Sequence, residues 1–194
     1  MNERTGRMIK ISLLSAIALI LMYFDFPVVP MFTWLKIDLS DVPALLGAFG
    51  FGPLAGMTIE LIKNLLILLT KGTQTGFVGE CANFIVGCSL VVPASFIYHR
   101  KKSKKSAIIG MIIGAALMEV VGIIANVYFL IPAFGMNMTN SETINYVVAG
   151  LLPFNGIKAL LISVTTYILY KKVSVSVFKA ESNFGSCEKI QKRY

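Results

Sequence analysis

Charged residues are scarce in this chain of 194 residues: they make up 14% of it, whereas 56% of its residues are hydrophobic. Soluble domains carry about 25% charged residues, so the composition excludes an ordinary soluble domain. The only histidine is His99, and the sequence contains no HExxH, GxSxG or Walker A segment. An intramembrane protease or serine hydrolase therefore has no support, and the chain cannot drive itself with ATP. Its cysteines, Cys81, Cys88 and Cys187, form no CxxC pair, and we expect buried thiols.

Most of the 18 lysines and arginines gather in three clusters that flank apolar runs. The clusters are Arg4, Arg7 and Lys10; Arg100, Lys101, Lys102, Lys104 and Lys105; and Lys171, Lys172, Lys179, Lys189, Lys192 and Arg193. Lysine and arginine accumulate in cytoplasmic loops, so we expect all three inside the cell. Both termini then face the cytoplasm, and the number of membrane spans is even. The net charge of +8 is explained by topology and anionic lipid rather than by nucleic-acid binding.

A membrane-spanning helix needs about 20 mostly apolar residues. We predict an all-α integral membrane protein with a single membrane domain, residues 1–194, and six transmembrane helices. The predicted spans are about 9–26, 42–52, 54–70, 77–98, 106–131 and 153–170, followed by a cytoplasmic tail at 171–194.

The connections between these spans differ in length on the two sides of the membrane. Residues 28–41, 71–76 and 132–152 become external loops, the last with a short helix around 143–149, and Pro153 opens the final helix. The internal connection at Gly52-Pro53 is minimal. An elaborated outer face suits a protein that captures a ligand outside; the alternative is that the long loops merely cap the bundle.

Small residues spaced four apart allow helices to approach closely in lipid. Three sets have this spacing: Ala44, Ala48, Gly52 and Gly56; Gly110 and Gly114; and Ser12 and Ala16. We assign the first two sets to packing within the chain. The third set lies in the first span, where its small face could also receive another protein.

Polar side chains inside spans are costly and usually face a cavity or a partner. The predicted spans contain Glu60, Lys63, Asn64, Glu80, Asn83, Glu119, Asn126, Asn155 and Lys158. Most lie in the outer part of their spans by helical rise, which indicates an outward-facing polar pocket. Glu60 and Lys63 can pair with each other.

Asn155 and Lys158 share a helix face near the outer end of the last span, with no acidic residue within a turn, so we favour ligand binding for both. The alternatives are that Lys158 snorkels to the interface or pairs with Glu119 or Asp41.

Aromatic residues accompany the outer polar groups: Phe32, Trp34, Phe77, Phe84, Tyr128, Phe129, Phe134, Tyr146 and Phe154. An interfacial aromatic belt explains such residues in many membrane proteins. Aromatic rings beside neutral amides also suit a flat, heteroaromatic, mostly uncharged ligand, whose ring they stack on and whose edge the amides contact.

Three segments resemble the substrate-binding S components of energy-coupling factor (ECF) vitamin transporters, most closely the riboflavin-specific members. Residues 35–46 resemble the first external loop and second-helix entry, residues 50–56 the tight second turn, and residues 153–158 the start of the last helix. The resemblance extends from the first span to Tyr170. It implies a multi-pass protein of the bacterial cell membrane that captures one vitamin, riboflavin, near the outer side and then reorients. The implied partners are a transmembrane coupling protein and two ATPase subunits, which hydrolyse the ATP.

The polar and aromatic positions, taken with this resemblance, give a candidate riboflavin site: Asn155, Lys158, Asn126, Asn83, Leu39, Asp38, Asn64, Phe134 and Phe154. Ser12 and Ala16 are the candidate contact with the coupling protein, although the AxxxA motif of the family is SxxxA here. We expect no catalytic residue, metal or cofactor, riboflavin being the transported ligand. The remaining alternatives are an S component for thiamine, biotin or folate, and a stand-alone ion-coupled carrier. Such carriers often contain internal repeats, and none is visible here.

Overall fold

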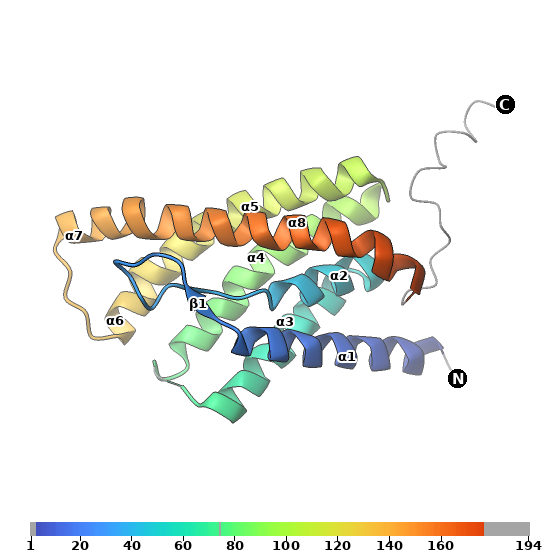
Figure 1. Ribbon diagram of the computed structural model, residues 1–194, viewed down its shortest axis with the longest axis horizontal. Helices are drawn as coiled ribbons and strands as arrows, with labels where there is room; N and C mark the ends of the chain where they lie inside the picture. Colours follow the sequence, from blue (N-terminus) through green and yellow to red (C-terminus); the bar gives the residue numbers. More distant parts are fainter. Residues whose placement is uncertain (1–2, 74, 177–194) are drawn as a thin grey trace.

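The computed structural model describes residues 3–73 and 75–176, which form a bundle of helices (Figure 1). The helices are α1 (Glu3–Tyr23), α2 (Asp41–Phe51), α3 (Pro53–Lys71), α4 (Val78–Arg100), α5 (Lys104–Ala125), α6 (Ile131–Ala133), α7 (Asn140–Asn145) and α8 (Leu152–Ser176). Two π-helical segments, η1 (Asn126–Leu130) and η2 (Tyr146–Leu151), continue α5 and precede α8. Strands β1 (Phe26–Pro27) and β2 (Lys36–Ile37) pair antiparallel between α1 and α2.

Within this described part of the chain, five helical stretches are long and apolar enough to cross a membrane. They are Arg4–Tyr23, Pro53–Lys71, Val78–Arg100, Lys104–Ala133 and Asn140–Tyr170. The predicted span at 42–52 corresponds to α2, whose 11 residues extend only about 16 Å at 1.5 Å per residue. Because its residues from Asp41 to Phe49 are all buried, α2 is a core helix surrounded by the longer ones.

The structure corrects the prediction for the last external loop. Residues 140–176 form one continuous helix through α7, η2 and α8, where we predicted a loop over 132–152. Thr139 starts this helix with a capping box: its side chain accepts the backbone N–H of Glu142, and the Glu142 carboxylate accepts the backbone N–H of Thr139 at 2.8 Å. Pro153 lies inside the helix rather than in its first turn, and η2 just before it adapts the backbone to the proline. The predicted tail at 171–194 begins within α8, and residues from 177 onward lie outside the described residues.

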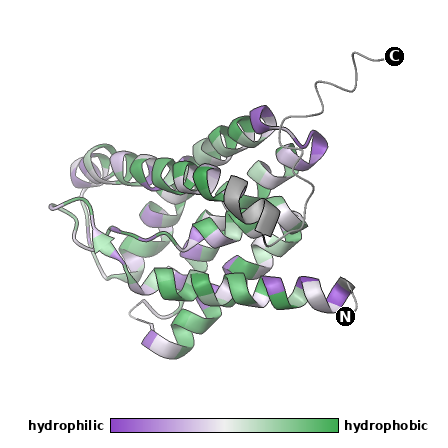
Figure 2. Cartoon of the chain, turned by 45° about the vertical axis from the view of Figure 1, so that its right-hand side comes forward, coloured by the Kyte–Doolittle hydropathy of each residue, from purple (hydrophilic) through white to green (hydrophobic). Residues whose placement is uncertain are grey.

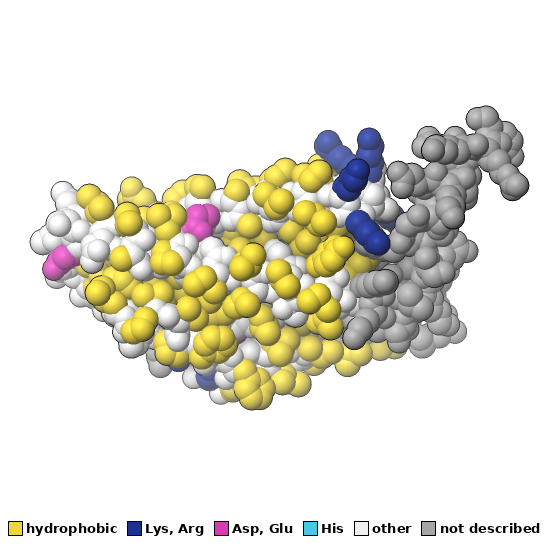
Figure 3. All heavy atoms as spheres, turned by 45° about the horizontal axis from the view of Figure 1, so that its top comes forward, with side chains coloured by type: hydrophobic (Ala, Val, Ile, Leu, Met, Phe, Trp, Pro, Cys, Tyr) yellow, Lys and Arg dark blue, Asp and Glu magenta, His cyan; other side chains and the backbone are white. Residues whose placement is uncertain are grey.

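The first two basic clusters lie at one end of the bundle, which we call the basic end; the third cluster, from Lys179 onward, lies outside the described residues. In Figure 1, α1 begins and α8 ends there, and α4 joins α5 there, whereas β1, α6 and α7 lie at the opposite end. Figure 3 shows lysine and arginine side chains gathered at that end. Arg7 Nη2 also donates to the carbonyl oxygen of Phe51 at 2.5 Å, which ties α1 to the tight α2–α3 turn. Figure 2 shows hydrophilic residues mainly at the helix ends.

Close packing through small residues is confirmed at Gly110, Gly114 and Gly56 but not at Gly52, where nothing lies within 4 Å of an added Cβ. A Cβ at Gly110 would lie 2.6 Å from the carbonyl oxygen of Ala94, and one at Gly114 would lie 2.5 Å from that of Leu90, so these glycines let α5 contact the α4 backbone. A Cβ at Gly56 would lie 2.6 Å from the Cβ of Ala48.

The third small-residue set and the cysteines lie elsewhere. Ser12 and Ala16 are exposed on α1, so no helix of the bundle occupies that face. Cys81 is exposed and Cys88 is half-buried, which contradicts the expectation of buried thiols for these two; Cys187 lies outside the described residues.

Candidate functional site

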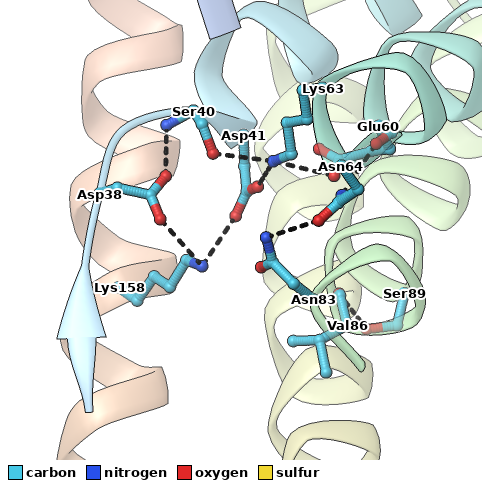
Figure 4. Close-up of polar contacts among 10 residues, drawn as sticks. All are labelled: Asp38, Ser40, Asp41, Glu60, Lys63, Asn64, Asn83, Val86, Ser89 and Lys158. Atoms are coloured by element: carbon cyan, nitrogen blue, oxygen red, sulfur yellow. Dashed lines mark hydrogen bonds and ion pairs between the residues drawn. The ribbon is translucent and has the colours of Figure 1, made fainter. Parts of the chain in front are cut away.

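A cluster of buried charged side chains joins α2, α3 and α8 (Figure 4). It contains Asp38 from the loop after β2, Asp41 from the first residue of α2, Glu60 and Lys63 from α3, and Lys158 from α8, all buried. Isolated charges in such surroundings are strongly disfavoured, so each must have a partner.

Lys63 has three oxygen neighbours around its ammonium within this cluster. The ammonium pairs with Asp41 Oδ1, donates to Ser40 Oγ at 2.9 Å and lies 2.9 Å from Glu60 Oε2. The contact with Glu60 is an ion pair, because neither Glu60 carboxylate oxygen has a hydrogen-bond partner among the described residues. The predicted pairing of Glu60 with Lys63 is confirmed.

Lys158 is paired with acids that do not belong to its own helix. Its ammonium nitrogen lies 3.3 Å from Asp41 Oδ2 and 4.0 Å from Asp38 Oδ2. The prediction considered acids within one turn of α8, whereas both partners come from the segment that leads into α2. The alternative of a pair with Asp41 is the one confirmed.

Lys158 has two ion-pair contacts, whereas Lys63 has two hydrogen bonds and one ion pair. Asp41 Oδ2 lacks a hydrogen-bond partner among the described residues, because the Lys158 contact lacks hydrogen-bond geometry. Lys158 therefore retains N–H donors for a further acceptor. It lies several turns inside the continuous helix, not near the outer end as predicted.

Two predicted site residues extend this cluster toward α4. Asn83 Nδ2 donates to Asn64 Oδ1 at 3.0 Å, and Asn64 Nδ2 donates to the carbonyl oxygen of Glu60 at 2.8 Å. Figure 4 shows Asn83 and Asn64 beside the α3 members of the charge cluster.

A second polar group links the loop between α1 and α2 to the last two long helical stretches. Trp34 Nε1 donates to the Tyr146 hydroxyl at 3.2 Å, and that hydroxyl donates to Asn126 Oδ1 at 3.1 Å. The ring of Phe32 packs edge-on against Trp34 and Tyr146, with centroids 5.5 and 4.9 Å away. The buried ring of Phe154 belongs to the same apolar cluster. The sequence pattern had included Tyr146 only among the aromatic residues, and nothing in it indicated this hydrogen-bond chain.

Asn155 lies between the two groups. It precedes Lys158 by one turn on α8, and a Cβ at Gly122 would lie 2.7 Å from its Nδ2, so that glycine makes room for the amide. The carbonyl of Gly122 also accepts from Asn126 at 2.8 Å. Asn155 is 2% exposed, and its Nδ2 makes no hydrogen bond of standard geometry in the described part of the chain, although its side chain interacts with the Glu119 carboxylate of α5. A buried amide donor without an acceptor is costly, and a ligand acceptor would satisfy it.

Not all of the other predicted site residues belong to these two polar groups. Leu39 is half-buried and packs against the main apolar core, and Phe134 is 39% exposed. Phe77, Tyr128 and Phe129 are also exposed, as expected for an aromatic belt. An apolar cavity of about 370 Å³ between α4 and α5, and one of about 320 Å³ at the basic end, are lined by neither Asn155 nor Lys158.

The arrangement suits binding of a ligand that offers several hydrogen-bond acceptors and carries no net charge. Lys158 and Asn155 are buried donors with spare capacity, and the ring group of Phe32, Trp34 and Tyr146 is linked through Asn126 to the same stretch of α5. Asp41 and Asp38 already balance the charge of Lys158, so an anionic ligand is not required there.

Residues 6–170 match the protein family described as the substrate-specific component of ECF transporters. The chain belongs to this family. It is therefore an S component, a transport protein rather than an enzyme, and a multi-pass protein of a bacterial cell membrane.

Two curated relatives cover most of this S component. It is 40% identical over 177 residues to the riboflavin transporter RibU of Staphylococcus aureus (strain TCH60), covering 89% of this chain and 92% of that one. It is 36% identical over 176 residues to the riboflavin transporter FmnP of Bacillus subtilis (strain 168), covering 88% and 93% of the two chains.

Solved structures agree with the fold of this S component. One, described as the S component of a bacterial ECF transporter, shares 40% identity with a TM-score of 0.77, covering 89% of this chain and 98% of that chain. Another, ThiT from Listeria monocytogenes, shares 22% identity with a TM-score of 0.62, covering 91% and 99%, and supports the fold alone.

Proposed function

We propose that this S component captures riboflavin from outside the cell for ATP-driven uptake. The observation that carries the proposal is a pair of buried polar side chains on α8: Asn155 Nδ2 makes no hydrogen bond of standard geometry with a described residue, and Lys158 Nζ contacts Asp41 and Asp38 as ion pairs. Riboflavin has ring carbonyls and a hydroxylated side chain, so it offers acceptors to both donors without a net charge. Its flat ring suits the neighbouring aromatic group. The similarity to proteins named riboflavin transporters supports the same ligand.

We further propose that the five long helical stretches and the core helix α2 together form the membrane unit, and that both termini face the cytoplasm. The supporting observation is that the first two basic clusters gather at one end, since lysine and arginine favour the cytoplasmic side. The predicted riboflavin residues Asn126, Asn155 and Lys158, with Asn83, Asn64 and Asp38 around them, then lie in the bundle between its core and its outer end.

Energy for uptake is proposed to come from partner subunits. The sequence has no Walker A segment, so two ATPase subunits would hydrolyse ATP and a transmembrane coupling protein would contact this chain. The exposed small face at Ser12 and Ala16 is the proposed contact, because small side chains let a partner helix approach closely. We expect no bound cofactor in this chain.

An absorbance spectrum of the detergent-purified protein, followed by calorimetric titration, tests the ligand. Co-purified flavin should colour the preparation yellow, and flavin-free protein should bind riboflavin saturably. Thiamine, biotin and folate serve as competitors, because S components for other vitamins are the alternative. Saturable binding of one of these vitamins, with no binding of riboflavin, would assign the chain to that vitamin instead.

A further inference from the structure

We propose that Lys63 is a positioning residue that fixes Lys158 for the ligand through the carboxylate of Asp41. The inference rests on the proposed function, because it concerns the lysine assigned there to riboflavin. Asp41 is shared by two lysines from different helices: Oδ1 pairs with Lys63 of α3, and Oδ2 lies 3.3 Å from Lys158 of α8 (Figure 4).

The orientation of the Asp41 carboxylate depends on this second partner. The terminal torsion of an aspartate side chain is broad rather than confined to one narrow well. Lys63 holds Oδ1 and so leaves Oδ2 directed at Lys158. Without Lys63 the carboxylate could rotate toward Lys158 and draw its ammonium away from the position that it holds here.

Lys63 is itself held in place by a packed chain of contacts. Ser40 Oγ and Glu60 Oε2 each lie 2.9 Å from its nitrogen. The Glu60 carboxylate lies against Gly87 of α4, where a Cβ would approach Oε2 to 2.5 Å, so the glycine provides the space for that carboxylate. The α4 backbone therefore supports Glu60, Glu60 supports Lys63, and Lys63 supports Asp41.

The numbers of lysines and acids in the cluster also indicate that Lys63 affects how Lys158 is held. Two lysines, Lys63 and Lys158, face three acids, Asp38, Asp41 and Glu60. Removal of Lys63 would leave Lys158 as the only ammonium of the cluster for these carboxylates. Lys158 would then be held more strongly by Asp41 and Asp38, and its free donors would be less available to an uncharged ligand.

Titration calorimetry tests the inference by comparing riboflavin affinities. The variants are Lys63→Met and Glu60→Gln/Lys63→Met, and each is made both in the native protein and in the Lys158→Ala protein. In the native background, the double variant removes both members of the α3 ion pair and leaves Asp41 paired with Lys158. We expect either variant to weaken riboflavin binding by about tenfold in the native background. Displacement of Lys158 should cost only part of the free energy of its charged hydrogen bond to the ligand. In the Lys158→Ala background we expect no further loss, because a positioning residue acts only through the residue it positions.

Lys71→Met is the matched control. It makes the same change on the same helix, at a lysine that lies 3.8 Å from Asp25 and is 44% exposed, and riboflavin affinity should be unchanged. Equal losses from Lys63→Met in both backgrounds would overturn the inference, as would an unchanged affinity in the native background. Failure of the Glu60→Gln/Lys63→Met protein to fold would assign Lys63 to stability and would overturn it as well.

The same titrations also show whether the binding role of Lys158 or the proposed function is wrong. If Lys158→Ala binds riboflavin as the native protein does, the binding role of Lys158 is wrong and the positioning role is wrong with it. If the native protein binds no riboflavin, the proposed function is wrong.

Discussion

Lys158 of α8 and Asp41 of α2 form a buried ion pair, with the ammonium nitrogen 3.3 Å from a carboxylate oxygen. The pair connects the last helix to the segment that follows the loop between α1 and α2. It also rules out snorkelling as the role of Lys158, since the side chain is 6% exposed.

Lys158→Ala is expected to weaken riboflavin binding. A hydrogen bond to a charged donor contributes about 1.5–3 kcal/mol, which corresponds to a loss of about ten- to a hundredfold in affinity. Asp41 keeps Lys63 as a partner, so the protein should still fold, with a lower midpoint of thermal unfolding. Calorimetry on the folded Lys158→Ala and Asn155→Ala proteins measures both effects. Native affinity in both variants would remove these residues from the binding site.

Gly114→Ala is expected to destabilise the bundle. The added methyl would lie 2.5 Å from the carbonyl oxygen of Leu90, a backbone atom that cannot move aside. Overpacking of this kind costs about 1–3 kcal/mol, which thermal unfolding in detergent would register as a lower midpoint. Gly156→Ala is the matched control: it lies in α8 with nothing within 4 Å of the added Cβ, so the midpoint should stay the same or rise. Equal midpoints for both variants would show that α4 and α5 are not in close contact.

The sequence predicted most of the helices but not how the last one begins. Hydrophobic runs and small-residue spacing identified the elements and the α4–α5 contact, since both are local patterns. The polar stretch at 139–145 looked like a loop because its composition is polar, whereas the Thr139–Glu142 capping box and η2 allow one helix to continue through Pro153. The sequence named Asp41 only as one alternative partner of Lys158, because Asp41 is remote in sequence and only tertiary packing brings it to α8.

Ala16→Trp is expected to block riboflavin uptake by cells while leaving binding to the purified protein intact. Ala16 is exposed on α1, and a large ring there would keep a partner helix at a distance. Ala116→Trp is the control, because it makes the same change at an exposed alanine on α5. Radiolabelled uptake and calorimetry separate the two steps. Normal transport by Ala16→Trp cells would exclude this face of α1 as the coupling surface.

Cysteine labelling in intact cells tests the orientation of the bundle. In a background with Cys81, Cys88 and Cys187 replaced by serine, Asn137→Cys should react with an impermeant maleimide and Lys102→Cys should not. Asn137 is exposed in the turn before α7, and Lys102 is exposed between α4 and α5 at the basic end. Lys102→Cys should react once the cells are permeabilised, which controls for its reactivity. Labelling of Lys102→Cys in sealed cells would reverse the assigned orientation.

Trp34 is expected to report on ligand binding, because it is the only tryptophan in the chain and it donates to Tyr146 beside the proposed site. Riboflavin bound against this aromatic group should quench its fluorescence.

Tyr146→Phe keeps the ring but removes the acceptor for Trp34 and the donor to Asn126. Each lost hydrogen bond costs about 0.5–1.5 kcal/mol, and the Asn126 amide is then held only by its hydrogen bond to the Gly122 carbonyl, so we expect affinity to fall by about three- to tenfold. Quenching at saturating riboflavin should persist in this variant, since Trp34 and the ring of residue 146 remain. Tyr128→Phe, at a tyrosine that is 71% exposed, is the control and should bind as the native protein does. Unchanged Trp34 fluorescence in the native protein at saturating riboflavin would place the ligand away from the loop between α1 and α2. Equal riboflavin affinities for the two tyrosine variants would show that the Trp34–Tyr146–Asn126 hydrogen-bond chain does not orient the site.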